Sequence, residues 1–423
     1  MNFIFFYLPF LIERIYMHFT NRQVDFRTKL WTCPFCMGRN HFPPHYAENI
    51  SDVNLPGELI PQYTTVEYEL QSQAASGPPS FLFVIDTCAD EDELGHLRDS
   101  LQQTLNLLPG DSLVGLMTFG SLVQVHELGF TECPRSYVFR GDKDYSPQKL
   151  QDMLGIMPNR GPNNLHNVSN TQDMHNKQIA IGRFLMPVNE CTYALEQILD
   201  DLQKDPWPSQ QDERVQRCTG TALGVAIGLL ESSVSRRGSR IMLFTTGPST
   251  CGNGAIVTRS KKESMRSHTD LLKSQAPLHK PAIMYYSAIA ERAITNNIVV
   301  DVFACSLDQV GTLEMKVLIS SSGGLIVLAD SFSQSVFRES LRRVFERSLD
   351  HNTGAPTGPL QMGFSGQIEV LHSREFKIAG AIGSVASLKK NGPSVSDTAV
   401  GIGYTLFSYL SRDNLLLIPI LAS

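Results

Sequence analysis

Two cysteines near the N-terminus have the spacing of a metal-binding motif. Cys33 and Cys36 are separated by two residues, and this C-x-x-C spacing lets both thiolates reach one zinc ion. A structural zinc site needs four ligands, which commonly come from two such pairs. The sequence has one pair here, and His41 and His45 are nearby donors whose short spacing does not obviously complete a tetrahedron. We therefore expect half of a zinc module, with Cys33 and Cys36 as metal ligands.

A second group of possible metal ligands follows a continuous apolar run. Asp86, Cys88 and Asp90 come where a buried strand should end, and ligands bind at that end of the strands in an open α/β sheet. The segment resembles the D-x-S-x-S pattern with which von Willebrand A-type domains hold Mg²⁺ through oxygen ligands. Cys88 and Asp90 replace the two serines, and cysteine is a poor ligand for Mg²⁺. Thr221 and Thr246 could still supply oxygens, but we favour a vestigial site.

The sequence offers no enzyme active site. It contains no nucleophile elbow, Walker loop or dinucleotide fingerprint, and the glycines after residue 246 do not have the spacing of a phosphate-binding loop. His126 and His166 have no evident acid or nucleophile partner, so we expect core or surface roles for them. No catalytic residue is predicted.

Residues 71–350 alternate between strand and helix patterns. Continuous apolar runs predict buried strands, and leucines or aromatic residues at helical spacing predict the helices between them. The expected strands are Phe81–Asp86, Ser112–Phe119, Val123–Leu128, Arg240–Thr246, Ile298–Ala304 and Gly324–Ala329. The expected helices are Leu94–Leu108, Tyr193–Leu202, Thr219–Leu230, Leu313–Ser320 and Phe332–Leu349. This alternation predicts an α/β fold with a doubly wound, mainly parallel sheet. We expect long surface loops at Asn159–Lys177 and Gly247–Lys280, the latter without clear core positions.

The composition is that of a globular protein with an ordinary core. The chain has 423 residues, 42% of them hydrophobic, and a formal net charge of −6. This charge argues against a nucleic-acid partner recognised by a basic surface. A local basic face remained an alternative to ordinary solvated loops. Its residues would be Arg236, Arg237, Arg240, Arg259, Lys261, Lys262 and Arg266.

The cysteines indicate the cellular compartment, and the composition along the chain indicates its segments. Six of the eight cysteines are scattered singly, several beside apolar strands, which is typical of buried thiols in a reducing compartment. The apolar run Met1–Ile12 is too short to span a bilayer and is a poor signal peptide. We divide the chain into an atypical leader (1–22), a partial zinc-finger segment with extended chain (23–70), an α/β trunk (71–350), the start of a β-sandwich (355–403) and an atypical apolar tail (404–423).

Many runs, in the same order, resemble one family of vesicle coat proteins. The chain from residue 23 to about residue 400 is similar to the GTPase-activating subunit of the inner COPII coat, the Sec23 family. The matching runs are Gln23–Cys36, Arg39–Tyr46, Leu113–Gly120, Val125–Phe130, Phe184–Val188, Gln203–Pro208, Asp301–Gly311, Ser331–Glu346 and Ser373–Gly383.

The resemblance implies a von Willebrand A-like trunk, a zinc finger and a role in transport from the endoplasmic reticulum to the Golgi. It implies a cytoplasmic protein, peripheral on the endoplasmic reticulum membrane at exit sites and on COPII vesicles. A Sar-type small GTPase would recruit the protein. The cargo-binding inner-coat subunit would pair with it through the trunk, and the outer-coat cage would dock afterwards. No nucleic acid is expected.

The two ends depart from the family. Residues 1–22 contain no cysteine, and the chain diverges again past Gly403. In the family, an arginine of a helical domain stabilises charge on the transferred phosphate, an effect of about 10³ to 10⁵ in rate. The resemblance does not extend to that domain, so we expect partner binding with poor stimulation of GTP hydrolysis. The alternatives are a truncated, non-functional or dominant-negative coat fragment, or an A-type ligand-binding protein.

Overall fold

The structure is a computed structural model. It describes residues 5–7, 24–32, 39–42, 44–51, 53–55, 77–130, 132–156, 182–234, 237–347, 358, 360–369, 376–380, 395–400, 407–410 and 420–422. The chain forms two compact units. One comprises Met1–Ala75, Gly366–Thr405 and Leu416–Ser423, and the other comprises Ser76–Ser365 and Leu406–Leu415. Among the described residues, no helix is long and apolar enough to cross a membrane.

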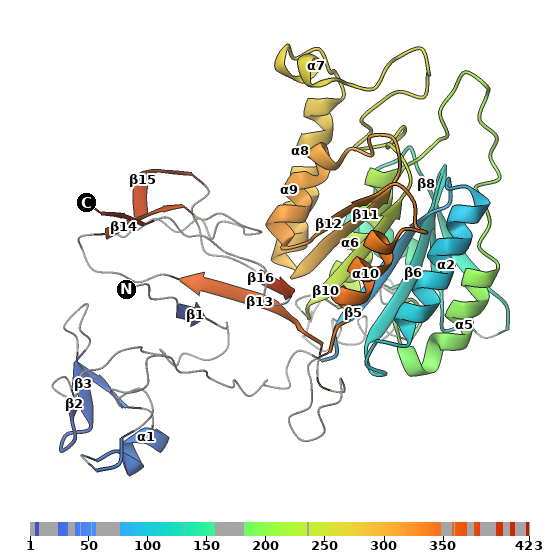
Figure 1. Ribbon diagram of the computed structural model, residues 1–423. Helices are drawn as coiled ribbons and strands as arrows, with labels where there is room; N and C mark the ends of the chain where they lie inside the picture. Colours follow the sequence, from blue (N-terminus) through green and yellow to red (C-terminus); the bar gives the residue numbers. More distant parts are fainter. Residues whose placement is uncertain are drawn as a thin grey trace, which may run out of the picture. The chain divides into compact units, whose positions relative to one another are not determined.

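The larger unit is built on one sheet with the strand order β12-β11-β10-β5-β6-β7-β8, in which the short β9 lies beside β6 (Figure 1). The strands are β5 (Ser80–Asp86), β6 (Leu113–Phe119), β7 (Leu122–Glu127), β8 (Arg135–Arg140), β9 (Met186–Pro187), β10 (Ser239–Thr245), β11 (Ile298–Cys305) and β12 (Ile326–Ala329). The pairings from β12 to β6 are parallel, and β7, β8 and β9 run antiparallel to their neighbours. The predicted mainly parallel α/β fold is confirmed.

Helices cover both faces of this sheet (Figure 1). One face packs against α3 (Pro147–Leu154), α6 (Thr219–Ser233), α8 (His279–Thr295) and α9 (Thr312–Ser322). The other packs against α2 (Glu91–Leu105), α5 (Val188–Asp200) and α10 (Ser335–Val344). All residues of β5, β6, β10 and β11 are buried, as expected for strands covered on both faces. Phe337 of α10 packs edge-on against Phe244 and Phe303, which stack on one another across β10 and β11.

Two sequence-based expectations for this unit were wrong. The strand predicted as buried at Gly324–Ala329 is β12, which is the outermost strand, and its Leu328 is 61% exposed. The stretch Gly247–Lys280 has core positions, because Ile256 and Val257 are buried in the same hydrophobic cluster as the residues of α8. That stretch also contains α7 (His268–Leu272). The predicted loop Asn159–Lys177 lies outside the described residues.

The smaller unit contains short strands around the predicted zinc segment. β2 (Val24–Asp25), β3 (Leu30–Thr32) and β4 (Arg39–His41) form an antiparallel sheet, followed by α1 (Pro44–Asn49). Trp31 is 2% exposed and packs with Val24 and Ile50. The remaining strands of this unit are β1 (Phe5–Tyr7), β14 (Phe376–Gly380), β15 (Val395–Val400) and β17 (Ile420–Ala422). The boundary between the units falls within β13 (Met362–Glu369), and β16 (Phe407–Leu410) belongs to the larger unit. β13, β14 and β15 fall in the segment predicted to be β-rich.

Candidate functional site

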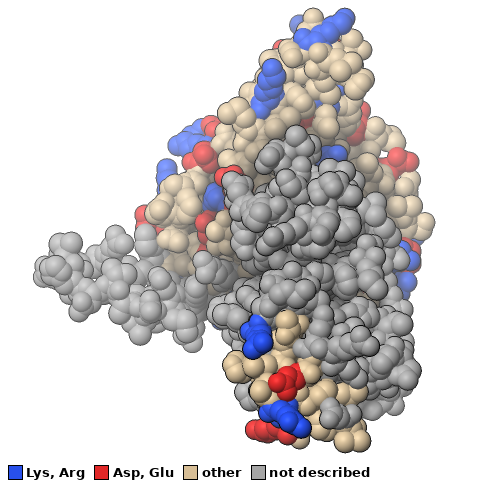
Figure 2. Space-filling model, turned by 90° about the vertical axis from the view of Figure 1, so that its left-hand side faces the viewer, with Lys and Arg blue, Asp and Glu red and all other residues tan. Residues whose placement is uncertain are grey.

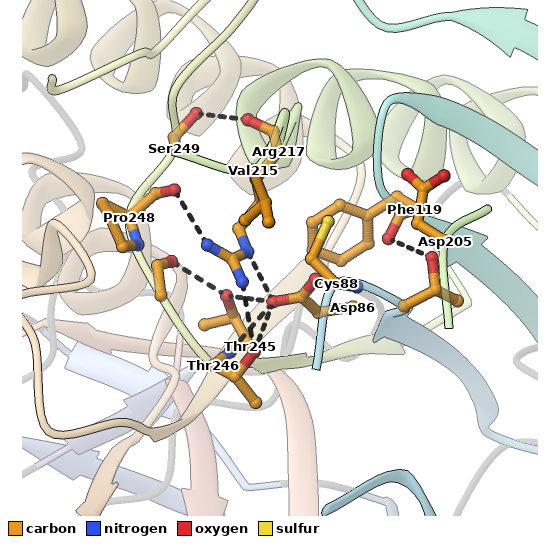
Figure 3. Close-up of polar contacts among 12 residues, drawn as sticks. Asp86, Cys88, Phe119, Asp205, Val215, Arg217, Thr245, Thr246, Pro248 and Ser249 are labelled. Carbon is orange, nitrogen blue, oxygen red and sulfur yellow. Dashed lines mark hydrogen bonds and ion pairs between the residues drawn. The ribbon is translucent and has the colours of Figure 1, made fainter. Parts of the chain in front are cut away.

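Asp86 lies where the sequence places it, at the carboxyl end of the central strand β5 (Figure 3). Its carboxylate is 1% exposed and accepts hydrogen bonds through both oxygens. Oδ1 accepts from the backbone N–H of Cys88 at 2.9 Å. Oδ2 accepts from Nε of Arg217 at 2.7 Å, from the Thr245 hydroxyl at 3.2 Å, and from the Thr246 N–H and hydroxyl at 2.9 Å and 3.1 Å.

Arg217 supplies the positive charge at this site. Its guanidinium is held from the other side, because it also donates to the Pro248 carbonyl oxygen at 3.3 Å and to the Thr246 hydroxyl at 3.2 Å (Figure 3). A buried carboxylate requires a compensating charge and hydrogen bonds. Arg217 and its neighbours provide both, so a metal ion at Asp86 would have to displace a guanidinium that is itself 5% exposed.

The other predicted oxygen donors point elsewhere. The Thr221 hydroxyl donates to the carbonyl oxygen of Gly141 at 2.8 Å. Asp90 forms an ion pair with Lys204, in which Oδ1 and Nζ are 2.6 Å apart, and the Asp90 side chain is largely exposed. Burial raises the pKa of Cys88 far above its usual range, so its sulfur is held as a thiol. Of the predicted set, the structure brings Asp86 and Thr246 together, and this arrangement does not fit a Mg²⁺ site.

A loop after α5 fixes the same edge of the sheet. Asp205 accepts from the backbone N–H of Ser121 at 2.6 Å, and its own N–H donates to the carbonyl oxygen of Thr87 at 2.8 Å. A side chain at Gly120 would collide with the Asp205 carboxylate, so this close approach requires glycine. Trp207 follows on the loop and is 63% exposed. The loop belongs to one of the runs that carry the family resemblance.

The predicted zinc ligands, Cys33 and Cys36, lie outside the described residues. The strands that flank them are described: β3 and β4 pair, with Thr32 opposite Arg39. The segment between Thr32 and Arg39, which contains both cysteines in the sequence, therefore connects two paired strands. Among the described residues, no group of three His, Cys, Asp or Glu side chains could hold a metal ion. Cys33 and Cys36 would hold zinc if it binds, and zinc would then brace the hairpin as a structural ion.

The remaining predicted candidates have structural partners. His126 Nε2 lies 3.0 Å from the Thr118 hydroxyl, and burial lowers the pKa of His126 to about 4. His166 lies outside the described residues. Burial of the singly scattered cysteines is confirmed for Cys88, Cys191, Cys218 and Cys305 but is wrong for two others, because Cys133 is exposed and Cys251 is half-buried.

The alternative of a local basic face is not supported. Arg240 is buried in an ion pair with Asp301, Arg259 pairs with Glu213, and Arg266 pairs with Glu314. Lys261 donates to the carbonyl oxygen of Gln211 at 2.9 Å. On the face drawn in Figure 2, basic and acidic side chains of the described residues are interspersed. Local ion pairs and hydrogen bonds account for Arg240, Arg259, Lys261 and Arg266, and Arg236 lies outside the described residues.

The functional residue that sequence reasoning missed is Arg217. It lies 131 residues from Asp86 in the chain, and no local pattern links the two. An arginine directly before the first turn of α6, at the carboxyl edge of the sheet, was the available signal. The helix begins at Thr219, so its preceding residues necessarily lie near that edge.

Comparison with known proteins agrees with this architecture. Residues 76–348 match the family described as the Sec23/Sec24 trunk domain, and residues 16–46 match the Sec23/Sec24 zinc finger. Human COPII-coat protein Sec24c has a similar fold, with a TM-score of 0.54 and 16% identity. The match covers 93% of this chain and 49% of that chain, so the chain spans about half the length of Sec24c.

A von Willebrand factor type A protein from Catenulispora acidiphila is also similar. It has a TM-score of 0.36 and 11% identity, with 82% of this chain and 63% of that chain covered. The trunk-domain match takes in more than half of the sequence. The chain therefore belongs to the Sec23/Sec24 family.

Proposed function

We propose that this chain is a COPII coat component that binds the cargo-binding inner-coat subunit through its trunk. The match of residues 76–348 to the Sec23/Sec24 trunk domain carries the proposal. The COPII-coat protein Sec24c, with which the chain shares its fold, supports it. The runs quoted above resemble the GTPase-activating subunit, so within the family we assign the chain to that subunit.

The Asp86 site favours a scaffold over a ligand-binding A-type protein. A-type domains that bind ligands through Mg²⁺ need an acidic group whose oxygens are open to the ion. Here Asp86 is buried and saturated by Arg217, Thr245 and Thr246. At the edge of the sheet that would bind a ligand, the charge of Asp86 is instead neutralised by Arg217. This favours a structural role for the trunk.

Strand β12 provides a surface suited to pairing with another protein. It is the outermost strand of the sheet on the side of β11, and its sequence is Ile-Val-Leu-Ala, without a charged residue. Leu328 is 61% exposed and Ile326 is 37% exposed. An edge strand presents backbone N–H and C=O groups to an added strand, and exposed apolar residues on it add affinity.

The opposite edge of the same sheet is protected. Strand β8 begins at Arg135 and ends at Arg140, which pair with Glu127 and Asp142 respectively. Charged residues on an edge strand disfavour the addition of another strand. We therefore assign the trunk of the partner subunit to the β12 edge.

Co-elution of this chain with the cargo-binding coat subunit tests the proposal. We expect a one-to-one complex that Leu328→Asp weakens by about tenfold or more, because a charge would be buried in the contact. Val138→Asp is the matched control, since Val138 is 51% exposed on the β8 edge. This variant should bind the partner as tightly as the unaltered protein does. Absence of a complex would overturn the proposed partner. A complex insensitive to Leu328→Asp would leave the partner in place and overturn only the assigned edge.

The finer functions of the family follow as part of the same proposal. We expect a Sar-type small GTPase to recruit the chain to the endoplasmic reticulum membrane and to COPII vesicles, and the outer-coat cage to dock afterwards. We expect the chain to bind the GTP-bound form of that GTPase, and a binding assay that finds no preference for the GTP-bound form would contradict this expectation.

A further inference from the structure

We propose that Cys218 and Cys251 form a thiol modification site, in which a peroxide oxidises Cys251 and Cys218 then closes a disulfide with it. The two residues come from different elements. Cys218 is the residue before α6 and is buried, whereas Cys251 is half-buried in the loop that follows β10. The sequence separates the two cysteines by 33 positions, and the fold brings them together.

Backbone hydrogen bonds fasten these two segments to each other. The N–H groups of Thr250 and Cys251 both donate to the carbonyl oxygen of Arg217, at 3.0 Å and 3.2 Å. In return, the Arg217 N–H donates to the Thr250 hydroxyl at 2.9 Å, and that hydroxyl donates to the Val215 carbonyl oxygen at 2.7 Å. The backbone of Cys251 is therefore held beside the residue that precedes Cys218, so the fold places the two cysteines in adjacent segments.

The two thiols also interact electrostatically. The Cys218 thiol donates a hydrogen bond to the sulfur of Cys251, which lowers the pKa of Cys251 and, together with burial, raises that of Cys218. A hydrogen bond from Gln216 and the charge of Arg259 also stabilise the Cys251 thiolate, whereas burial and the charge of Asp142 oppose it. The site thus places a thiol with a lowered pKa next to one that stays protonated, the arrangement of redox-sensitive cysteine pairs.

The chemistry balances with a peroxide as the oxidant. The Cys251 thiolate attacks one oxygen of hydrogen peroxide, so that an S–O bond forms, the O–O bond breaks and hydroxide leaves. The sulfur of Cys218 then attacks the sulfenic sulfur of Cys251. The S–S bond forms, the S–O bond breaks, and the hydroxyl leaves as water with the proton of Cys218. Two thiols are oxidised and one peroxide is reduced.

The site has little free space around Cys218. A Cβ at Gly141 would lie 2.8 Å from the Cys218 sulfur and 2.5 Å from the Ser121 carbonyl oxygen. A bulky reagent therefore cannot reach Cys218 without moving the backbone, whereas Cys251 retains partial exposure. This asymmetry assigns Cys251 as the sulfur oxidised first and Cys218 as the resolving thiol.

Peptide mapping of the full chain tests the proposal. The reduced protein is treated with hydrogen peroxide, and its digest is analysed by mass spectrometry without reduction, which reports each cysteine separately. We expect a cross-linked pair of peptides containing Cys218 and Cys251, lighter than their sum by two hydrogen atoms. Failure to detect that cross-link, while other cysteines are oxidised, would overturn the proposal. This measurement uses the unaltered protein and does not depend on the folding of a variant.

A variant then identifies the sulfur that the peroxide oxidises. In Cys218→Ser the disulfide cannot form, so we expect a sulfenic acid at Cys251, trapped by dimedone about tenfold faster than at Cys133. Cys133 is the matched control because it is the more exposed thiol, and access alone would favour it. In Cys251→Ser, Cys218 should remain unmodified. Faster labelling of Cys133, or labelling of Cys218 in Cys251→Ser, would contradict the assigned roles.

Discussion

Nε of Arg217 lies 2.7 Å from Oδ2 of Asp86, and the two side chains are 5% and 1% exposed. The pair lies at the end of the central strand, where A-type domains hold a metal ion. Here the cation is the guanidinium of Arg217. A guanidinium cannot exchange with solvent as a metal ion does, so the trunk needs no ion to neutralise Asp86. The ion pair also joins β5 to the segment that leads into α6.

Removing the charge of Arg217 should destabilise the trunk strongly. Arg217→Met leaves the Asp86 carboxylate buried without its cation, and we expect a loss of about 3 to 5 kcal/mol in the free energy of unfolding. The double variant Asp86→Asn/Arg217→Met should recover most of that loss, because no buried charge remains. Urea denaturation measures both effects.

Magnesium provides the companion measurement for the same site. Because Arg217 already neutralises Asp86, Mg²⁺ is expected to leave the melting temperature of the unaltered protein unchanged. A rise in that temperature with Mg²⁺ would mean that a cation binds the trunk, contrary to the description of the Asp86 site.

A second buried pair should show the same sensitivity. Arg240 and Asp301 are each 0% exposed and form two hydrogen bonds, at 2.8 Å and 2.6 Å. Asp301→Asn should lower the free energy of unfolding by about 3 to 5 kcal/mol. Glu339→Gln is the matched control, because Glu339 and Arg342 form an exposed pair whose loss should change stability by at most about 0.5 kcal/mol. Equal effects of the two variants would show that burial does not determine how much free energy of unfolding is lost when an ion pair is broken.

Much of the trunk could be predicted because its signals are local. The apolar runs of β5, β10 and β11 are continuous, and each observed bound differs from the predicted one by at most one residue. Helix α8 was not predicted, although Ala282, Tyr286 and Ile289 have helical spacing. Three of its five buried residues are alanines, whose weak hydrophobicity gives little pattern.

The site was harder to predict because its contacts are distant in sequence. The pattern after β5 identified Asp86, but the burial of β12 and the partner of Asp86 depend on strand order and on a loop far along the chain. A buried strand and an apolar edge strand have the same composition. The pair of Cys218 and Cys251 was likewise invisible as two single cysteines.

Zinc binding by Cys33 and Cys36 can be tested by metal analysis. Both residues lie within the segment that matches the Sec23/Sec24 zinc finger. We expect zinc to copurify with the chain and to be lost in Cys33→Ser/Cys36→Ser, because thiolates are the ligands that zinc prefers here. The melting of the larger unit should not change, since it has its own core. Equal zinc content in both proteins would rule out these ligands.

His126 should give the trunk a characteristic sensitivity to acid. Burial lowers its pKa to about 4, whereas an unfolded histidine titrates near 6.5. Between these two values the unfolded state binds a proton that the folded state does not, so stability falls as the pH decreases through this window. The stability that neutral His126 contributes is fully present above about pH 6.5 and is completely lost below about pH 4.

His126→Gln isolates this contribution. Glutamine does not titrate and can still bond to the Thr118 hydroxyl, which lies 3.0 Å from Nε2 in the native side chain. Between pH 7 and pH 5 we expect the variant to remove a pH-dependent loss on the order of 1 to 3 kcal/mol. His96→Gln is the control, since it alters a histidine on α2 outside this site. Urea denaturation at pH 7 and at pH 5 gives the slope for each protein. A slope that is unchanged in His126→Gln would assign the acid sensitivity to other groups, and a steeper slope would contradict the direction of the shift.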